Sequence, residues 1–283
     1  MLRLLQDGTG AAQLHAQVSL SGAYSVTADA DGLVGVWDVR ASAANVCRLH
    51  LGARPSALYF AGIAEPLLSA TWQDCALSAW DLRLVRLSLA RVTRCCGQAL
   101  NAFSNSDFGQ VRRPAAVLAG HGDVITQARL IGSGWSATAV TGSADWTLAA
   151  FSLQLSCLTA SLALHSAPVT GMLVLPAADT SAAAWDCWSI SRAGHLSRCT
   201  SALQDPLHVD TGQGSLMSLH AYGDDVVTVS ADGATAHWDA STGERVHVAE
   251  LRQSVTVTAA DASAVYAGSA DGTVSVWRFT EGL

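Results

Sequence analysis

The sequence contains no lysine. All 16 basic residues are arginine, and only four of the 23 acidic residues are glutamate. Without lysine, the chain has no lysine nucleophile and no Schiff-base chemistry, and a phosphate-binding Walker loop would be incomplete. Codon bias in a GC-rich genome explains this composition, which is also rich in alanine. Selection against lysine modification is the alternative explanation.

Membrane-spanning runs and metal-binding patterns are also missing. No apolar run approaches the roughly 18 residues of a membrane span, and Met1–Leu5 resembles neither a signal nor a transit peptide. The seven cysteines include no Cys-x-x-Cys pair, and no histidine stands at zinc-finger spacing. Scattered cysteines in odd number are typical of buried, reduced thiols. We therefore expect a soluble intracellular protein of the cytoplasm or nucleus, with no metal and no cofactor.

Catalytic motifs are absent too. The sequence has no Gly-x-Ser-x-Gly elbow and no His-Glu-x-x-His pair. These absences predict that the protein is not an enzyme.

The main positive feature is a repeat of about 40 residues. Residues 230–238 and 269–277 both begin Ser-Ala-Asp-Gly and end in Trp, six residues after the Asp. A turn of this kind between two strands, repeated at this period, is typical of a propeller blade. Seven positions align on the turn residue: Asp31, Asp74, Asp107, Asp145, Ala193, Asp232 and Asp271. The corresponding residues six positions later are Trp37, Trp80, Arg113, Phe151, Cys199, Trp238 and Trp277.

These residues resemble the WD40-repeat family over nearly the whole chain. Trp-Asp pairs follow three of the turns, at 37–38, 80–81 and 238–239, and Gly120-His121 is the one clear Gly-His pair. The resemblance implies an all-β fold, a seven-bladed β-propeller that forms a single domain over residues 1–283. The blade around Asp107 is the irregular one, because its spacing is short and Arg113 takes the place of the Trp. The competing interpretation is six blades with a long insertion between Trp80 and Gly120.

The ends of the chain predict how the ring closes. Only six residues follow Trp277, and Leu2–Gln6 is strand-like. We expect this N-terminal strand to supply the fourth strand of the last blade, since closure removes exposed sheet edges. In related families an open six-bladed form is completed by a partner's strand, which would leave Leu2–Leu5 available.

The resemblance also implies a buried hydrogen-bonded set of Asp, His, Ser or Thr, and Trp in a complete blade. His121 and Asp145 match it best, with Thr141 or Ser143 as the hydroxyl and Phe151 in place of the Trp. His15 is expected to partner Asp31, and His165 lacks its usual acceptor because Ala193 replaces the Asp. The residues assigned a structural role are Asp31, Asp74, Asp107, Asp145, Asp232, Asp271, His121, Trp37, Trp80, Trp238 and Trp277.

Aromatic and arginine residues near the turns predict a partner-binding site. Trp146 directly follows its turn Asp, where the clearest repeats have Gly, and Phe108 and Trp72 lie beside neighbouring turns. Trp and Arg are enriched at interface hot spots. The alternative for Trp72 and Trp146 is local packing, and Trp188 is expected to fill the core. Six of the 16 arginines fall within the 31 residues 83–113, here called the Arg-rich stretch. Four of them complete the candidate site: Arg91, Arg94, Arg112 and Arg113.

From these features we predict a non-catalytic protein–protein interaction scaffold, a subunit or adaptor of a multiprotein complex. The alternative is an RNA-associated propeller of a ribonucleoprotein assembly that uses the Arg-rich sector, although a net charge of −7 does not favour bulk attraction to nucleic acid. A propeller hydrolase is a third class, and it would require an accessible nucleophile and base in one pocket.

Overall fold

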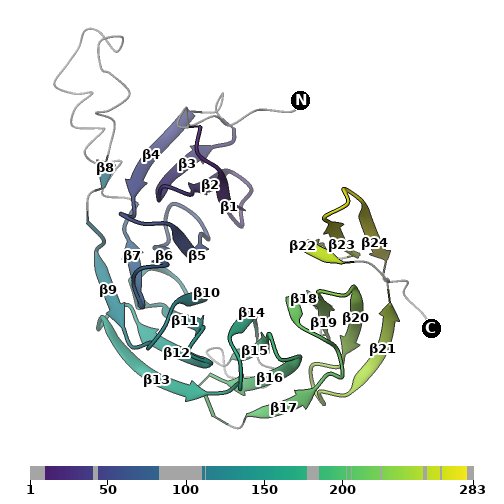
Figure 1. Cartoon of the computed structure of the whole chain (residues 1–283). Helices are drawn as coiled ribbons and strands as arrows, with labels where there is room; N and C mark the ends of the chain where they lie inside the picture. Colours follow the sequence, from purple (N-terminus) through teal and green to yellow (C-terminus); the bar gives the residue numbers. More distant parts are fainter. Residues whose placement is uncertain are drawn as a thin grey trace, which may run out of the picture. The chain divides into compact units, whose positions relative to one another are not determined.

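The computed structural model describes residues 10–40, 44–82, 110–111, 113–176, 185–201, 203–204, 206–223, 225–250, 254–261 and 263–278. In these residues the chain forms six β-sheets, numbered here 1 to 6 in chain order (Figure 1). The fold is an all-β propeller, and each sheet is one blade. A single 3-10 turn, Gly134–Ser136, is the helical element of the described residues. No helix among them has the length and hydropathy to cross a membrane.

The described residues divide into two compact units, one drawn from 1–140 and 151–159 and the other from 141–150 and 160–283. The first unit holds sheets 1 and 2. Sheet 1 has the spatial order β1-β2-β3-β4-β8, which spans Gln13–Val18, Tyr24–Asp29, Leu33–Asp38, Ala44–His50 and Gln110–Val111. Sheet 2 has the order β5-β6-β7-β9, which spans Pro55–Tyr59, Leu67–Thr71, Ala76–Trp80 and Ala116–Ala119.

Sheet 3 takes residues from both parts of that division and is described by itself. Its order is β10-β11-β12-β13, over Ile125–Ile131, Thr138–Ser143, Thr147–Ser152 and Cys157–Ala163. The hairpin between β11 and β12 contains Asp145 and Trp146 and belongs to the second unit.

The second unit also holds sheets 4 to 6. Sheet 4 is β14-β15-β16-β17, over Val169–Pro176, Trp185–Ser191, His195–Thr200 and Leu207–Asp210. Sheet 5 is β18-β19-β20-β21, over Leu216–Tyr222, Asp225–Ser230, Ala234–Trp238 and Arg245–Glu250. Sheet 6 is β22-β23-β24, over Val255–Ala260, Ala264–Ser269 and Val274–Arg278.

Among the described residues the strand order gives six blades, where seven were predicted for the chain. β7 pairs antiparallel with β9, so that Ala76 lies opposite Ala119 and Ala79 opposite Ala116. The chain therefore leaves sheet 2 after its third strand and returns as its fourth, as the six-blade interpretation with an insertion requires. Asp107, the turn residue of the predicted third blade, lies outside the described residues.

The predicted closure by Leu2–Gln6 also lies outside the described residues. Sheet 6 contains three strands among the residues that the structure describes, and β24 forms one edge of it.

The turns between the second and third strands explain why the Asp-Gly signal recurs. Gly32, Gly194, Gly233 and Gly272 occupy this turn in four sheets, and their φ angles lie between 84° and 88°. Glycine adopts this left-handed region without the steric penalty that a Cβ brings. Carboxylates in the same turns accept backbone N–H groups, as Asp271 does from Thr273 at 2.9 Å. The glycine and the carboxylate within each turn therefore determine where the hairpin forms.

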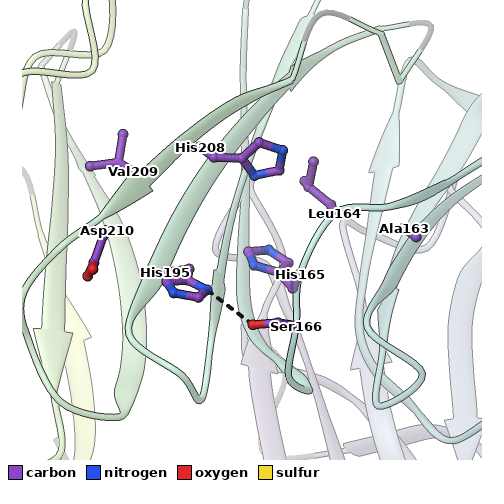
Figure 2. Close-up of a pocket in the computed structure, with 8 residues that line it drawn as sticks. All are labelled: Ala163, Leu164, His165, Ser166, His195, His208, Val209 and Asp210. Atoms are coloured by element: carbon purple, nitrogen blue, oxygen red, sulfur yellow. Dashed lines mark hydrogen bonds between the residues drawn. The ribbon is translucent and has the colours of Figure 1, made fainter.

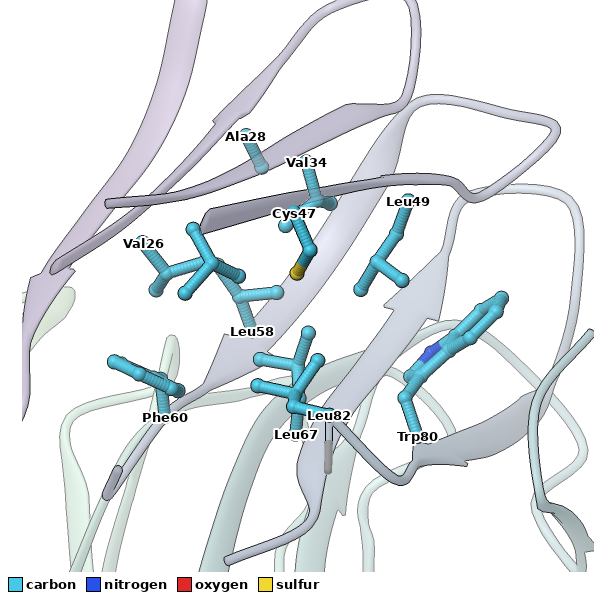
Figure 3. Close-up of a cluster of buried hydrophobic side chains, with 11 residues drawn as sticks. Val26, Ala28, Val34, Cys47, Leu49, Leu58, Phe60, Leu67, Trp80 and Leu82 are labelled. Atoms are coloured by element: carbon cyan, nitrogen blue, oxygen red, sulfur yellow. The ribbon is translucent and has the colours of Figure 1, made fainter. Parts of the chain in front are cut away.

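Apolar side chains of adjacent sheets form the cores. Figure 3 shows one such cluster in the first unit, where Val26, Val34 and Leu49 of sheet 1 meet Leu58 and Leu67 of sheet 2. In the second unit, a cluster centred on Trp188 and Trp238 joins sheets 4 and 5. A third cluster joins sheets 5 and 6. A blade alone cannot bury its apolar faces, so each is stabilised by its neighbours.

Three of the predicted structural tryptophans link the third strand of their sheet to the second by a side-chain hydrogen bond. The indole N–H groups of Trp37, Trp80 and Trp238 each donate to a hydroxyl, at 2.9 to 3.0 Å. The acceptors are Thr27, Ser69 and Thr228. Trp277 is partly buried and packs on the cluster between sheets 5 and 6.

The predicted pairing of His15 with Asp31 is wrong. The His15 ring hydrogen-bonds to the backbone carbonyl of Pro55, and burial lowers the pKa of His15. Asp29, which is fully buried, caps the turn instead, because its Oδ1 accepts the backbone N–H groups of Asp31 and Leu33 at 3.0 and 2.8 Å. The carboxylate stands two residues earlier than the repeat alignment placed it.

Candidate functional site

Trp146 is the most unusual residue of the predicted contact site. It occupies the turn position that glycine holds in four other sheets, and its φ angle is 73°. A bulky side chain in this region is an outlier that costs about 1–3 kcal/mol. Nevertheless, 49% of the Trp146 side chain is exposed, so little burial offsets this strain. Strain of this kind gathers at functional sites.

The backbone around Trp146 is anchored to the segment that follows β13. The Trp146 carbonyl accepts N–H groups from both Leu164 and His165, at 3.3 and 3.2 Å. At the corresponding Gly32 and Gly194, a neighbouring backbone carbonyl fills the place of a Cβ. The segment beside Trp146 must therefore lie differently from its counterparts, and it is this segment that lines a pocket.

Trp72 is also exposed, over 57% of its side chain. The guanidinium carbon of Arg54 lies 6.0 Å from the centroid of its ring, at the limit of a cation–π contact. The sequence had not singled out Arg54. Trp72 therefore presents an aromatic surface with a cation beside it.

The other predicted contact residues divide between described and undescribed parts of the chain. Arg113 is described and exposed. Phe108, Arg91, Arg94 and Arg112 lie outside the described residues. Trp72 and Arg113 belong to the first unit and Trp146 to the second. Their grouping into one site remains a proposal.

Beside Trp146 the second unit contains a pocket of about 380 Å³, here called the histidine pocket. It is lined by residues 163–166, His195 and residues 208–210 (Figure 2). Three imidazole rings, those of His165, His195 and His208, gather in it. They come from the segment after β13, from the start of β16 and from β17.

His165 has one satisfied ring nitrogen and one unsatisfied. Its Nε2 lies 2.7 Å from Oγ of Ser189, which is fully buried. Its Nδ1 is buried and has no hydrogen-bond partner among the described residues. The sequence had indicated this arrangement, since Ala193 stands where other turns have a carboxylate. Leaving a buried donor or acceptor unpaired costs about 1–3 kcal/mol.

In the pocket a hydroxyl also lies beside an imidazole, and a nucleophile next to a base is what the hydrolase alternative would require. Ser166 Oγ and His195 Nδ1 are 3.4 Å apart, longer than the roughly 2.6–3.2 Å of a nucleophile–base pair. Asp210 lies opposite His195 in the β16–β17 register, yet its Oδ1 accepts the Gly212 N–H at 3.0 Å. No hydrogen bond between Asp210 and His195 occurs in the described part of the chain, so no carboxylate orients that imidazole.

The set of residues that the resemblance implies around His121 and Asp145 makes local contacts in and beside sheet 3. His121 is buried, and its ring centroid is 6.2 Å from that of buried Phe151. Asp145 accepts the Thr147 hydroxyl at 2.6 Å, and Ser143 Oγ accepts the Asp145 backbone N–H at 3.2 Å. Thr141 Oγ1 donates to the Ala149 carbonyl at 3.4 Å.

The described cysteines are all free thiols, and the described residues contain no group of three or more His, Cys, Asp or Glu with the arrangement of a metal site. Burial raises the pKa of the Cys47 thiol to about 12. Cys95 and Cys96, in the Arg-rich stretch, lie outside the described residues.

His165 predicts a pH dependence of stability. Burial, and secondarily the neighbouring His195 and His208, lower its pKa from 6.5 to about 4. The unfolded chain therefore binds a proton between these values that the folded chain does not, and stability falls as pH drops from about 6.5 to 4. At about 1.4 kcal/mol per pKa unit, we expect His165 to contribute about 2–3 kcal/mol to that loss.

The measurement is urea unfolding of the wild type and of His165→Gln at pH 7.5 and pH 4.5. The variant should lose less stability between the two pH values than the wild type. His247→Gln is the control, because His247 is exposed on β21. Equal losses for the wild type and His165→Gln would contradict the prediction.

The sequence missed most of the histidine pocket. His165 was noticed, because it stands at the family's His position, but His195, His208, Ser166 and Asp210 carried no motif. The only local signal was the missing Asp at Ala193. Proximity of these residues depends on the pairing of β16 with β17, in which His195 lies opposite Asp210.

No family model matches the sequence, and no curated protein matches it. Solved structures do match. A chain of the mitotic checkpoint complex is 15% identical, with 98% of this chain and 77% of that chain covered and a TM-score of 0.74. The structures of U3-55K and of the RRP9 WD40 repeats are each 14% identical, cover 99% of this chain and 81% and 80% of theirs, and have TM-scores of 0.73. At such identities the likeness concerns the fold, which is that of a WD40-type β-propeller.

Proposed function

We propose that this protein is a non-catalytic interaction scaffold, a subunit or adaptor of a multiprotein complex, which docks a partner on the surface around Trp146. The observation that carries this proposal is a half-exposed tryptophan held at a φ of 73° in a turn built for glycine. A residue that adds strain without gaining burial is explained if a partner covers it. Trp side chains supply large contact area at interface hot spots.

The wider contact site includes Trp72, Phe108, Arg91, Arg94, Arg112 and Arg113. The cation beside Trp72 and the exposed guanidinium of Arg113 suit an acidic partner surface, since guanidinium groups bind carboxylates bidentately. The fold supports this role, because propellers of this type occur in complexes such as the mitotic checkpoint complex. Fold alone does not decide function.

The proposal includes one propeller over residues 1–283, with Leu2–Gln6 as the fourth strand of sheet 6, in a soluble protein of the cytoplasm or nucleus. The edge of β24 supports the closure, because an uncovered edge invites association. The RNA-associated alternative depends on the Arg-rich stretch, of which the described residues include Arg113 alone. Loss of captured material after ribonuclease treatment would favour it.

The test is Trp146→Gly. Glycine accepts the left-handed φ without strain, so the variant should melt no lower than the wild type. Affinity purification from the cells of origin should nevertheless recover at least about tenfold less partner, as expected for a hot-spot residue worth about 1.4 kcal/mol or more. Leu20→Ser is the control, because Leu20 is an exposed apolar residue, 89% exposed, far from this turn in sequence.

Unchanged recovery of the same proteins by folded Trp146→Gly would rule out the contact site. Loss of recovery by Leu20→Ser to the same extent would show that the binding is nonspecific.

A further inference from the structure

Four arginines in the described part of the chain lie over an aromatic ring, and they differ in what their guanidinium groups bind. Arg40, Arg129 and Arg198 each donate to a carboxylate or to a backbone carbonyl, at 2.8 to 3.0 Å. The guanidinium of Arg54, over Trp72, makes no hydrogen bond and no ion pair with a described residue. Its five N–H donors are therefore available to solvent or to a ligand.

The Trp72 ring beside this guanidinium is exposed over 57% of its side chain, the largest fraction for a tryptophan among the described residues. Trp72 directly follows β6, in the turn to β7. Its indole N–H has no hydrogen-bond partner in the described part of the chain. The Arg54–Trp72 pair thus combines unused donors with an open apolar surface.

The charge of Arg54 acts on a neighbouring group. His15, on β1, is half-buried, and burial is the main cause that lowers its pKa. A hydrogen bond to the Pro55 backbone raises this pKa, and the positive charge of Arg54 lowers it again. An anion bound at the guanidinium would offset that charge, so the pKa of His15 would rise. His15 can therefore report whether an anion occupies Arg54.

Two exposed carboxylates near the pair decide which anion fits. Asp74 lies two residues after the tryptophan, and the turn that follows Asp31 abuts the backbone of Ala53, next to Arg54. Neither carboxylate forms an ion pair with Arg54 in the described residues. An RNA backbone carries a charge at every nucleotide and would meet both carboxylates. A single carboxylate needs one guanidinium only, so it fits between them.

We propose that the Arg54–Trp72 pair binds the carboxylate of an Asp or Glu side chain of the partner protein. The guanidinium donates to both carboxylate oxygens, and the exposed ring packs against the methylene groups of the same side chain. This inference rests on the proposed function, because Trp72 belongs to the wider contact site, and it adds the type of residue that the site recognises.

The first experiment adds three probes to the full-length, ¹⁵N-labelled protein: N-acetylglutamate amide, its glutamine counterpart and a uridine oligonucleotide. Nuclear magnetic resonance follows the Trp72 indole N–H signal and the pKa of His15. The glutamate probe should shift the indole signal saturably in the millimolar range and raise the pKa of His15, and the glutamine probe should do neither. Equal effects of these two probes, or an effect of the oligonucleotide alone, would overturn the proposal.

The second experiment removes the guanidinium. Arg54→Gln should weaken binding of the glutamate probe at least tenfold, and it should raise the pKa of His15 without a probe. Arg40→Gln is the matched control, because Arg40 is an exposed arginine of the same unit that also lies over an aromatic ring but already has a carboxylate partner. Wild-type affinity in a folded Arg54→Gln protein, or an equal loss in Arg40→Gln, would overturn the proposal.

Capture of the cellular partner separates this inference from the scaffold proposal. If Trp146→Gly loses the partner and Arg54→Gln keeps it, the acidic anchor is wrong and the scaffold stands. If both variants lose the partner, both proposals are supported. If Trp146→Gly keeps it, the contact at Trp146 fails, and the glutamate titration alone then decides whether Arg54 recognises a carboxylate.

Discussion

Replacing Trp188 with Ala is expected to lower the free energy of unfolding by about 3–5 kcal/mol. Trp188 lies in the middle of β15 and is fully buried. It belongs to the cluster that joins sheets 4 and 5, where it packs with Ile190, Leu216 and Trp238. Its loss would leave a cavity between two blades that β15 cannot move to close, since this strand is paired on both sides, with β14 and with β16.

The matched variant is Trp188→Phe. The indole N–H of Trp188 is buried without a hydrogen-bond partner among the described residues. Phenylalanine removes this unsatisfied donor while keeping most of the apolar volume, so the two effects offset each other, and we expect a change below about 1.5 kcal/mol. Urea unfolding followed by tryptophan fluorescence and circular dichroism measures both variants. A loss below about 1 kcal/mol for Trp188→Ala would contradict the assigned packing.

Gly194→Ala is expected to cost about 3–5 kcal/mol, from backbone strain of about 1–3 kcal/mol and overpacking of similar size. Gly194 has a φ of 84°, and a Cβ at this position would collide with the backbone carbonyl of Gln213. The Gly194 carbonyl also accepts the hydroxyl of Thr211 at 2.6 Å and its N–H at 3.2 Å. The two loops are therefore held together and cannot separate to admit a methyl group.

Gly212→Ala measures the conformational part of this effect alone, so its difference from Gly194→Ala gives the steric part. Gly212 also has a positive φ, of 65°, but a Cβ there would meet no atom within 4 Å. We expect it to lose only the conformational part, about 1 kcal/mol. Thermal melting of both variants under the same conditions gives the comparison. Similar losses in the two would show that the contact with Gln213 contributes nothing.

Gly194 and Trp146 occupy the same turn position, in sheets 4 and 3 respectively. The same kind of turn excludes even a methyl group in sheet 4 and accommodates a tryptophan in sheet 3. In both turns the carbonyl of this residue accepts backbone N–H groups from the segment after the fourth strand, Thr211 in sheet 4 and Leu164 and His165 in sheet 3. In sheet 4, however, the Gln213 carbonyl also occupies the place of a Cβ. The segment that is hydrogen-bonded to Trp146 also lines the histidine pocket.

Much of the fold was predictable because propeller blades are encoded locally. The Asp-Gly turn and the Trp six residues later lie within one hairpin, so their spacing is set by the turn and the pairing of two adjacent strands. Trp37, Trp80 and Trp238 confirm this, since each donates to a hydroxyl of the preceding strand. The interpretation of Trp188 as core filling is confirmed for the same reason, because its slot in the second strand follows from the register.

The candidate site was predictable only in part. Trp72 and Trp146 stood out because they interrupt the turn pattern, and both are exposed. Arg54 did not stand out, because its position over Trp72 depends on where β5 begins relative to β6. The exact capping residue of the first turn was also mistaken, because Asp29 and Asp31 are both carboxylates within one turn, and only burial distinguishes them.

By itself, the sequence determined the propeller class, the turn register and the absence of a carboxylate at Ala193, because these properties depend on residue type within a few positions. Tertiary structure decided the number of blades and the composition of the site. The pairing of β7 with β9 joins residues more than 30 positions apart, and no local pattern records that closure. Likewise, His165, His195 and His208 share a pocket because three separate segments of the backbone converge there, and a sequence repeat cannot encode such a convergence.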